Sequence, residues 1–325
     1  MRAIAIEQFG GPDVLRLVDL APRAPGPGEV LVRMAFASVN PADWKSREGW
    51  LKPLPYFAYS FPLVLGFDGS GVIEQVGRGV AGFKPGDRVF VRSQHGNGKW
   101  GTYAEFAVTG GDSVAHVPDG LSLADAATVP TAALSAWAGL FDTGALKAGE
   151  TVLINGGGGS VGSFAVQFAR AIGARVAATC SVKNMDYVRS LGAEHVIDYA
   201  GDVAAGLRHW AADGVDLVYD AVGIGTMLNG PDMARPGGRY VYISTMVPGE
   251  VLPEGKSDVP VLFSTMKRED VATRLQEIAA LMVAGKVKPP AYDILPLAQA
   301  AEAHRRLQAG RMRGKILLQV DPNAR

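Results

Sequence analysis

The sequence predicts a two-part protein, in which a mainly β unit is joined to an α/β unit built on a parallel sheet. Up to residue 123, short strand-like runs follow one another closely, and Gly, Pro and Asp separate them. Many short strands at close spacing favour a small barrel or sandwich. From residue 124 on, strand-like runs alternate with helical patterns. That alternation predicts a parallel sheet with helices on both faces.

The strands of the first part are recognised by their apolar residues and by the turns between them. Turn sequences such as Lys84-Pro85-Gly86-Asp87 separate consecutive runs. The predicted strands cover residues 4–6, 15–18, 29–34, 71–76, 87–91 and 103–108.

The second part contains the unit around which the whole chain is organised. An apolar strand at 151–154 leads into four glycines, and a helical pattern with one apolar face follows. Gly157-x-Gly159-x-x-Gly162 matches the dinucleotide fingerprint, and the same residues also read as Gly156-x-x-Gly159-x-x-Gly162. An early glycine allows a sharp turn, Gly159 lets the backbone approach a pyrophosphate, and Gly162 lets the helix lie close to the sheet. The predicted phosphate-binding residues are Gly157, Gly158, Gly159, Ser160, Val161 and Gly162.

Further elements continue the alternation of strands and helices. Strands are predicted at 175–179, 195–197, 215–220, 238–243 and 259–263, with a helix near 186–191. The segment 269–283 has helical periodicity, and residues 315–320 form a last strand. That last strand is more similar to the strands of the first part than to those of the second. We therefore expect the chain to return to the first part at its end.

Composition narrows the classes of function. Lys and Arg total 32, as do Asp and Glu, so net charge gives no argument for a nucleic-acid or membrane partner. Cys180 is the single cysteine, which excludes an intrachain disulfide and a Cys-rich zinc site. The first residues lack the apolar core of a signal peptide, and no apolar run is long enough to span a bilayer. We therefore expect a cytoplasmic enzyme.

In their order and spacing, several short segments resemble the medium-chain dehydrogenase/reductase superfamily, and within it the zinc-independent, zeta-crystallin-like quinone oxidoreductases. Each segment is weak by itself, whereas together they are specific for the superfamily and less specific for the substrate. The segments are 1–15, 27–32, 38–43, 65–72, 85–89, the glycine-rich loop, 191–199 and 314–318, and the resemblance covers essentially the whole chain.

The resemblance implies a fold and a division of the chain. Residues 1–123 and 267–325 would form a GroES-like, partly open β-barrel domain that binds the substrate. Residues 124–266 would form a Rossmann domain, a doubly wound parallel sheet that binds the dinucleotide. The reduction site would lie in the cleft between the two domains. The family also suggests a homodimer, which sheet extension could form if 259–263 is an exposed edge strand.

The residues after the second strand of the α/β part favour NADPH. An NAD-preferring site usually has an acid about 20 residues after the glycines, bonded to the ribose 2′-hydroxyl. The segment 178–184 has no acid, whereas Ser181 and Lys183 offer a hydroxyl and an ammonium to a 2′-phosphate. The resemblance adds Tyr199, which matches a family position that contacts this phosphate. The alternative for Lys183 is a solvated surface lysine.

The resemblance also indicates reduction without a metal. The zinc-dependent relatives carry a Cys and a His-Glu pair in the first domain, whereas this chain has Phe67 where that His would be. Phe cannot ligate zinc, and the five histidines are scattered without metal-like spacing. Without a Lewis acid, the hydride acceptor should be intrinsically electrophilic. We therefore expect NADPH to reduce a small, apolar, planar quinone or α,β-unsaturated carbonyl.

Candidate catalytic residues lie between residues 37 and 68. Asn40 matches a family position at the nicotinamide–substrate cleft, where its amide would hold the carbonyl or the ribose. Lys45 would stabilise negative charge on oxygen or donate a proton, and its alternative is a surface charge. Asp68 is expected to brace its turn through the carboxylate.

An aromatic-rich segment surrounds these candidates, and it predicts either an apolar lid over a planar substrate or ordinary loop packing. Tyr56 and Phe67 are the aromatic residues that we expect to contact the substrate. The aromatic segment comprises Trp44, Trp50, Tyr56, Phe57, Tyr59 and Phe61.

Four further residues are expected to line the cofactor site from the α/β part. Ser135 aligns with a family Thr near the nicotinamide, and its alternative is a hydroxyl on a helix surface. Val222, Ser244 and Phe263 lie at the carboxyl ends of predicted strands, where open α/β sheets bind ligands.

Two other functions stay open at this point. The same site could reduce an enoyl thioester or a 2-alkenal. A non-catalytic NADPH-binding sensor or scaffold could instead retain the glycine-rich loop. In such a sensor, Asn40, Lys45 and the aromatic segment would be dispensable.

Overall fold

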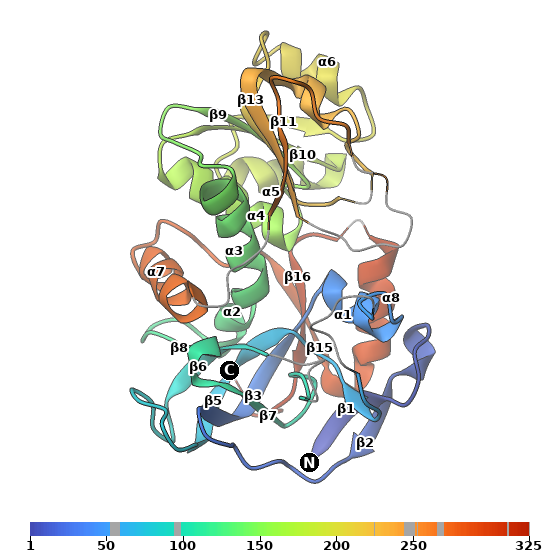
Figure 1. The fold of residues 1–325 in the computed structure, drawn as a ribbon, viewed down its shortest axis with the longest axis vertical. Coiled ribbons are helices and arrows are strands. Elements are labelled where there is room, and N and C mark those ends of the chain that lie inside the picture. The colour runs from blue at the N-terminus through green and yellow to red at the C-terminus, as the bar shows by residue number, and fades with distance from the viewer. Residues whose placement is uncertain are drawn as a thin grey trace.

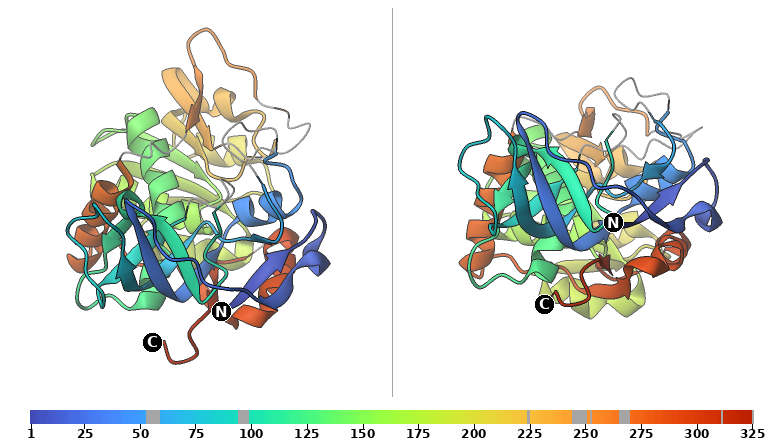
Figure 2. Two further views of the ribbon diagram at one scale, coloured as in Figure 1. Left: turned by 60° about the horizontal axis from the view of Figure 1, so that its bottom comes forward. Right: turned by 90° about the horizontal axis from the view of Figure 1, so that it is seen from below.

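A parallel sheet and an antiparallel unit divide the chain between them, and the parallel sheet lies at the top of Figure 1. The computed structural model describes residues 1–52, 59–93, 99–223, 225–243, 251, 253–264, 270–310 and 312–324. Both chain termini lie on the antiparallel unit, as Figures 1 and 2 show. No helix in these described ranges is long and apolar enough to cross a membrane.

The antiparallel unit is named for its described strand pairs, all of which run antiparallel except β15 with β16, and its described residues form ten strands in two sheets. They are β1 (Arg2–Ile6), β2 (Arg16–Asp19), β3 (Glu29–Val39), β4 (Leu63–Val64), β5 (Asp68–Val76), β6 (Arg88–Arg92), β7 (Phe106–Gly110), β8 (Val114–His116), β15 (Tyr292–Pro296) and β16 (Lys315–Gln319). The smaller sheet has the order β2-β1-β4, and the larger has the order β15-β16-β3-β5-β6-β8, with β7 paired to β3. β16 runs antiparallel to β3, with Ile316 opposite Val39. The return of the chain to its first part is thus confirmed.

The parallel sheet has six strands in the order β11-β10-β9-β12-β13-β14. Their bounds are β9 (Thr151–Asn155), β10 (Arg175–Cys180), β11 (His195–Asp198), β12 (Val215–Asp220), β13 (Ala234–Ile243) and β14 (Val261–Ser264). The chain fills one side of β9 first and then the other, so the strand order reverses beside β9. Open α/β sheets bind ligands beyond the carboxyl ends of the strands at such a reversal. The predicted Rossmann sheet is confirmed.

Helices cover both faces of the parallel sheet. On one face, α3 (Pro130–Trp137), α4 (Ser160–Ala171) and α7 (Val271–Val283) share a hydrophobic core with the strands. Phe164 and Phe168 of α4 are buried in this core, and each contributes about 1.5–3 kcal/mol through burial. On the other face, Leu207 of α6 (Val203–Arg208) packs with Val218. The other α-helices with described bounds are α1 (Pro41–Arg47), α2 (Leu123–Ala127), α5 (Met185–Ser190) and α8 (Ala300–Ala309).

The packing of α7 bears on the domain division. This helix belongs to the segment 267–325 that we assign to the barrel domain, yet Leu275 and Ile278 lie in the same core as α3 and α4. The antiparallel unit has its own core, which includes Val32, Met34 and Ile316. α7 also contacts β8 of the antiparallel unit, so its packing does not assign it to one unit. The boundaries at 123/124 and 266/267 stay a prediction.

Candidate active site

The glycine-rich loop turns directly after β9. Gly156 has φ +80°, in the left-handed region that favours glycine. A Cβ on Gly162 would lie 2.1 Å from the carbonyl oxygen of Gly156, so a larger residue cannot fit there without moving the backbone. Position 162 thus requires glycine because it lies directly against the backbone of the loop itself.

The end of this loop has the form of a phosphate site. Gly159 is the N-cap of α4, which begins at Ser160. The first N–H groups of a helix have no partner within the helix, and the helix dipole places positive charge there. The six residues predicted to bind phosphate therefore lie together in one turn and the start of one helix, where backbone donors suit an anion.

Ser181, Lys183 and Tyr199 lie together beyond the ends of β10 and β11. The backbone N–H of Tyr199 donates to the carbonyl of Cys180 at 3.1 Å, which brings Tyr199 beside Ser181. Lys183 is exposed, and Tyr199 is 48 % exposed. The Ser181 hydroxyl is buried and has no hydrogen-bond partner in the described part of the chain. A buried hydroxyl without a partner, an exposed phenol and an ammonium are groups that can bind a phosphate ester.

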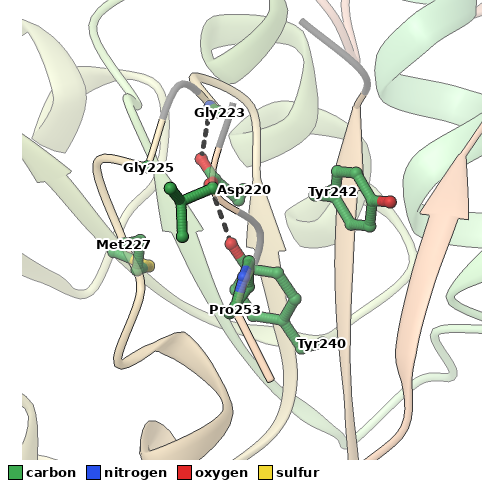
Figure 3. A pocket seen from close by; sticks show the side chains of 8 residues that line it. Asp220, Gly223, Gly225, Met227, Tyr240, Tyr242 and Pro253 are labelled. Atoms are coloured by element: carbon green, nitrogen blue, oxygen red, sulfur yellow. Dashed lines mark hydrogen bonds between the residues drawn. The ribbon is translucent and has the colours of Figure 1, made fainter. Parts of the chain in front are cut away.

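A chain of hydrogen bonds runs along the carboxyl ends of the central strands. The Thr179 hydroxyl accepts from the Gly156 N–H at 3.0 Å and donates to Asn155 Oδ1 at 2.7 Å. Asn155 Nδ2 donates to Asp220 Oδ1 at 2.8 Å. The Tyr240 hydroxyl donates to Asp220 Oδ2 at 2.8 Å, as Figure 3 shows. These contacts tie the glycine-rich loop to β12 and β13.

Asp220 also fixes the turn that follows β12. The backbone N–H groups of Val222 and Gly223 each donate to Asp220 Oδ1 at 3.0 Å. Val222 lies against Gly156, because a Cβ on that glycine would be 2.4 Å from Val222 Cγ2. Met227 and Tyr240 line a small pocket beneath this turn, together with Asp220 (Figure 3). The sequence prediction selected Val222 and missed Asp220.

Asn155, Thr179 and Asp220 had one signal in the sequence that could have identified them. Each is a polar residue at or next to the last position of a predicted strand, and the three strands are neighbours in the sheet. The carboxyl ends of parallel strands meet at one edge, so polar residues there lie close together. The predicted strand order would have been needed to use that signal.

Asn40 lies at the N-cap of α1 and is 3 % exposed. Its Nδ2 donates to Asp68 Oδ1 at 2.6 Å, and its Oδ1 accepts from Lys315 Nζ at 2.7 Å. An asparagine amide has two N–H groups and two acceptor lone pairs. The group that we expect to hold the substrate is therefore held on both sides by the protein, and among the described residues one N–H of its amide has no partner.

Asp43 braces the same region from inside α1. Its carboxylate accepts from the backbone N–H of Asn40 at 2.7 Å and from that of Phe67 at 3.0 Å. Burial raises the pKa of the Asp43 carboxyl to about 7. The Phe67 side chain is buried, and the Arg92 guanidinium lies 5.1 Å from the centre of its ring. Phe67 thus has a fixed backbone and an apolar face next to Asn40.

Asp68 connects the two parts of the chain. Its Oδ2 accepts from the backbone N–H of Thr131 at 2.6 Å, in the first turn of α3. Its carbonyl accepts from the Thr102 hydroxyl at 2.9 Å. These contacts agree with the bracing role predicted for Asp68 and extend that role to the start of α3, where a carboxylate is favourable.

Lys45 is only 5 % exposed, so the alternative of a solvated surface charge does not describe it. Its Nζ lies 5.6 Å from the centre of the Trp44 ring. Trp44 in turn meets Trp50 edge-on, with ring centres 4.8 Å apart. Lys45 and these two rings form one packed group on α1 and the turn after it.

Other aromatic residues of this region pack within the antiparallel unit. Tyr59 and Phe61 contact Phe9, with ring centres 5.5 Å and 5.1 Å apart. For these two residues the structure agrees with loop packing. Tyr56 and Phe57 lie outside the described residues, so the predicted contact of Tyr56 with substrate stays a prediction.

The remaining predicted cofactor residues differ in their surroundings. Ser135 is half-buried on α3, and its carbonyl accepts from the Tyr219 hydroxyl at 3.0 Å. Phe263 is 47 % exposed on the edge strand β14 and packs on Tyr242. The next residue, Ser264, is buried with a hydroxyl that has no hydrogen-bond partner in the described ranges. Ser244 lies outside the described residues.

The fold and the site agree with comparisons to known proteins. Residues 26–119 match a family model described as an alcohol dehydrogenase GroES-like domain, and residues 191–318 match one described as a zinc-binding dehydrogenase. The first match confirms the GroES-like part of the predicted fold. Despite the name of the second model, no group of three or more His, Cys, Asp or Glu among the described residues could hold a metal ion.

Individual relatives match over nearly the whole length of the chain. The chain is 35 % identical to "NAD(P)H oxidoreductase RTN4IP1, mitochondrial" of Danio rerio, over 98 % of this chain and 91 % of the relative. It is 31 % identical to "Quinone oxidoreductase" of Sus scrofa, over 98 % and 97 %. A solved structure of an alcohol dehydrogenase superfamily protein from Novosphingobium aromaticivorans has a TM-score of 0.86 at 32 % identity, covering 99 % of this chain and 100 % of that one.

Proposed function

This chain belongs to the quinone oxidoreductase family of the medium-chain dehydrogenase/reductase superfamily, and we propose that it uses NADPH to reduce a quinone or an α,β-unsaturated carbonyl without a metal. Membership makes the chain an oxidoreductase that uses a nicotinamide nucleotide. The single observation that carries the choice of NADPH is the cluster of Ser181, Lys183 and Tyr199 beside the glycine-rich loop. The segment 178–184, where an NAD-preferring site usually has its acid, contains none, and the nearest acid at these strand ends is Asp198, which pairs with Cys180 in the sheet.

The chain offers separate groups to each part of the cofactor. Backbone N–H groups of Ser160 and Val161 at the start of α4 would hold the diphosphate. Ser181 and Lys183 would hold the 2′-phosphate, with Tyr199 closing the site. When bound, NADPH supplies the hydride, and the protein supplies position and environment.

The other wall of the cleft would orient the substrate. The Phe67 ring, which is buried with the Arg92 guanidinium 5.1 Å from its centre, would form part of this wall, and an N–H of Asn40 would donate to an oxygen of the substrate or of the ribose. The ammonium of Lys45 would stabilise negative charge that develops on oxygen or return a proton to it. Asp43 and Asp68 keep these groups in place and contact no solvent.

The metal-free reaction is supported by side-chain chemistry. Phe67 cannot ligate zinc. Asn40 is held by Asp68 and Lys315 through both ends of its amide. An acceptor that delocalises added charge onto oxygen needs no Lewis acid, which favours quinones and conjugated carbonyls.

We propose a homodimer that forms through β14, an edge strand of the parallel sheet. The exposed Phe263 ring on this strand would be covered by the second copy. Light scattering tests this assembly, and a monomer at micromolar concentration would contradict it. A cytoplasmic location stays a prediction.

The proposed reaction is tested by steady-state oxidation of NADPH with a panel of 1,4-quinones, 2-alkenals, cyclic enones and an enoyl thioester. We expect turnover with at least one quinone or enone and no change after dialysis against EDTA. A preference for the thioester would instead favour enoyl reduction. Absence of NADPH oxidation with every acceptor would leave an NADPH-binding sensor and contradict the proposed activity.

A further inference from the structure

Lys315 is a buried lysine at the junction between the two parts of the chain. It begins β16, is 2 % exposed, and donates from Nζ to Asn40 Oδ1 at 2.7 Å. The carboxylates of Asp68 and Asp43 attract its charge from a longer distance. Neither the sequence motifs nor the proposed chemistry gives this ammonium a role.

The position of this charge is costly for the folded protein. Burial lowers the pKa of the Lys315 ammonium, and Asp68 and Asp43 only partly oppose that effect. A buried charge with few hydrogen bonds stabilises a fold poorly, and an apolar residue of similar size is often equally stable or more so. Stability therefore does not explain why a lysine occupies this position. The contacts that the chain makes on either side of Lys315 give the reason.

On one side, the backbone next to Lys315 contacts the glycine-rich loop. The N–H of Gly314 donates to the carbonyl of Gly158 at 2.8 Å, and Gly314 forms a parallel bridge with Gly159. Gly314 has φ +69°, and a Cβ on it would lie 1.7 Å from the Ala291 carbonyl oxygen. The chain is thus fixed against the proposed phosphate-binding residues immediately before Lys315.

On the other side, the Lys315 side chain reaches the proposed substrate wall. Asn40, its partner, is the N-cap of α1 and donates in turn to Asp68 Oδ1 at 2.6 Å. α1 carries Lys45, and Asp68 holds the backbone of Thr131 at the start of α3. The Gly314 backbone and the Lys315 side chain, adjacent in the chain, therefore connect the glycine-rich loop with α1.

We propose that Lys315 is a positioning residue, which acts through Asn40 to hold α1 at a fixed place relative to the glycine-rich loop. This inference rests on the proposed reductase function. Its consequence is a fixed distance between the hydride donor and the acceptor carbon. Hydride transfer needs close approach of the reacting atoms, and a displacement of about 1 Å can slow such a step about 100-fold.

The test compares Lys315→Met, Asn40→Leu and the double variant with the wild-type chain and with Lys286→Met, a matched change at an exposed lysine. Three quantities are measured: the NADPH dissociation constant by fluorescence, kcat, and the deuterium isotope effect with NADPH labelled at the transferred hydrogen. For Lys315→Met we expect kcat to fall about 10- to 100-fold. The dissociation constant should stay within about threefold, because the loop itself is intact. The isotope effect should rise, since hydride transfer becomes slower than product release.

The double variant and Lys315→Gln together separate positioning from folding. If both residues act through one hydrogen bond, it should be no slower than the slower single variant. The double variant also replaces both partners of the Lys315–Asn40 bond by apolar groups, but it leaves Asp68 Oδ1 without its Asn40 donor. Lys315→Gln keeps an amide donor toward Asn40, so it should fold if Lys315→Met does not, with a kcat between those of Lys315→Met and the wild type.

Three results would overturn the inference: an unchanged kcat, a loss confined to NADPH affinity, or a folded double variant with wild-type kcat. An inactive wild-type enzyme would contradict the proposed function first, and the inference with it. The wild-type measurement therefore tells the two failures apart.

Discussion

The cofactor side and the substrate side of the proposed cleft are held together by contacts of different range. The phosphate-binding residues are consecutive in the chain, and a strand, a turn and a helix place them. On the substrate side, Asn40 meets Asp68, 28 residues away, and Lys315, 275 residues away. Neighbouring residues therefore determine the cofactor side. The substrate side forms only when residues near the start and the end of the chain contact each other.

The two sides also differ in charge. Thr179 and Asn155 connect the glycine-rich loop to a single carboxylate, that of Asp220. The substrate side buries Asp43, Asp68, Lys315, Arg47 and His304. A cluster of several buried ionisable groups of both signs is more sensitive to the loss of one partner and to pH than a network of neutral groups around one carboxylate. We therefore expect substitutions in the glycine-rich loop and at the 2′-phosphate residues to change mainly cofactor binding. Substitutions at Asp220 and on the substrate side should change mainly rate, and those on the substrate side should also change the pH response.

The largest effect is expected for Gly162→Ala. Its Cβ would meet the Gly156 carbonyl at 2.1 Å, so the loop must move. Strain of about 1–3 kcal/mol and loss of phosphate donors should weaken NADPH binding about 100-fold, measured by fluorescence titration. Gly11→Ala is the control, because a Cβ at Gly11 meets nothing within 4 Å. NADPH affinity unchanged in Gly162→Ala would contradict the local description of the cofactor side.

Asp220→Ala should show the second-largest effect. It removes the acceptor of the Val222 and Gly223 N–H groups, and one of the two acceptors of the Asn155 amide, which keeps Thr226 Oγ1 at 3.2 Å. Each buried donor that loses its only acceptor costs about 1–3 kcal/mol. We expect kcat/KM to fall about 10- to 100-fold, while the affinity for 2′,5′-ADP stays within about threefold. Tyr240→Phe removes one hydrogen bond to the same carboxylate and should have a smaller effect. Equal losses of 2′,5′-ADP binding and kcat/KM would show that Asp220 supports the whole sheet.

Lys183→Ala tests one contact within the cofactor side, that of the lysine with the 2′-phosphate. The lysine is exposed, so loss of its contact with a 2′-phosphate should weaken NADPH binding about tenfold. NADH lacks that phosphate, and its affinity in the same variant is the internal control. A similar loss for both nucleotides would remove Lys183 from the phosphate site.

The last effect concerns the pH dependence of stability on the substrate side, and it leaves binding and rate aside. Burial and the Arg47 charge lower the pKa of His304 to about 3, from 6.5. The unfolded chain then binds more protons below pH 6.5, so His304 makes the fold less stable as pH falls from about 6.5 to 3. Burial raises the pKa of Asp43 to about 7, so its contribution is largest at low pH and is lost as pH rises from 3.8 to about 7.

These two contributions oppose each other between about pH 4 and 6.5. His304→Gln removes one of them. As pH falls, the free energy of unfolding of this variant should therefore increase relative to that of the wild type, by up to about 1.4 kcal/mol per pH unit. Urea unfolding at several pH values between 4.5 and 6.5 measures the difference. Parallel curves for the two proteins would contradict a neutral, buried His304.

The sequence predicts what adjacent residues determine. The β9–loop–α4 unit follows from periodicity and from glycine spacing. The return of β16 was predicted from the similarity of the last strand to those of the first part, and its pairing with β3 confirms it. The bracing role of Asp68 was also predicted. The sequence could not indicate that Lys315 would occupy the amide of Asn40, because nothing local relates residues at opposite ends of the chain. The orientation of Phe263 depends likewise on its pairing with Tyr242 across β13 and β14.

Cofactor choice is the central claim, because the Ser181–Lys183–Tyr199 cluster carries it. The most direct measurement is the ratio of kcat/KM for NADPH to that for NADH, with 1,4-benzoquinone as the acceptor at moderate ionic strength. We predict a ratio above about 10, which corresponds to about 1.4 kcal/mol for the 2′-phosphate contacts. A ratio near one, with turnover intact, would contradict the assignment of this cluster to the 2′-phosphate.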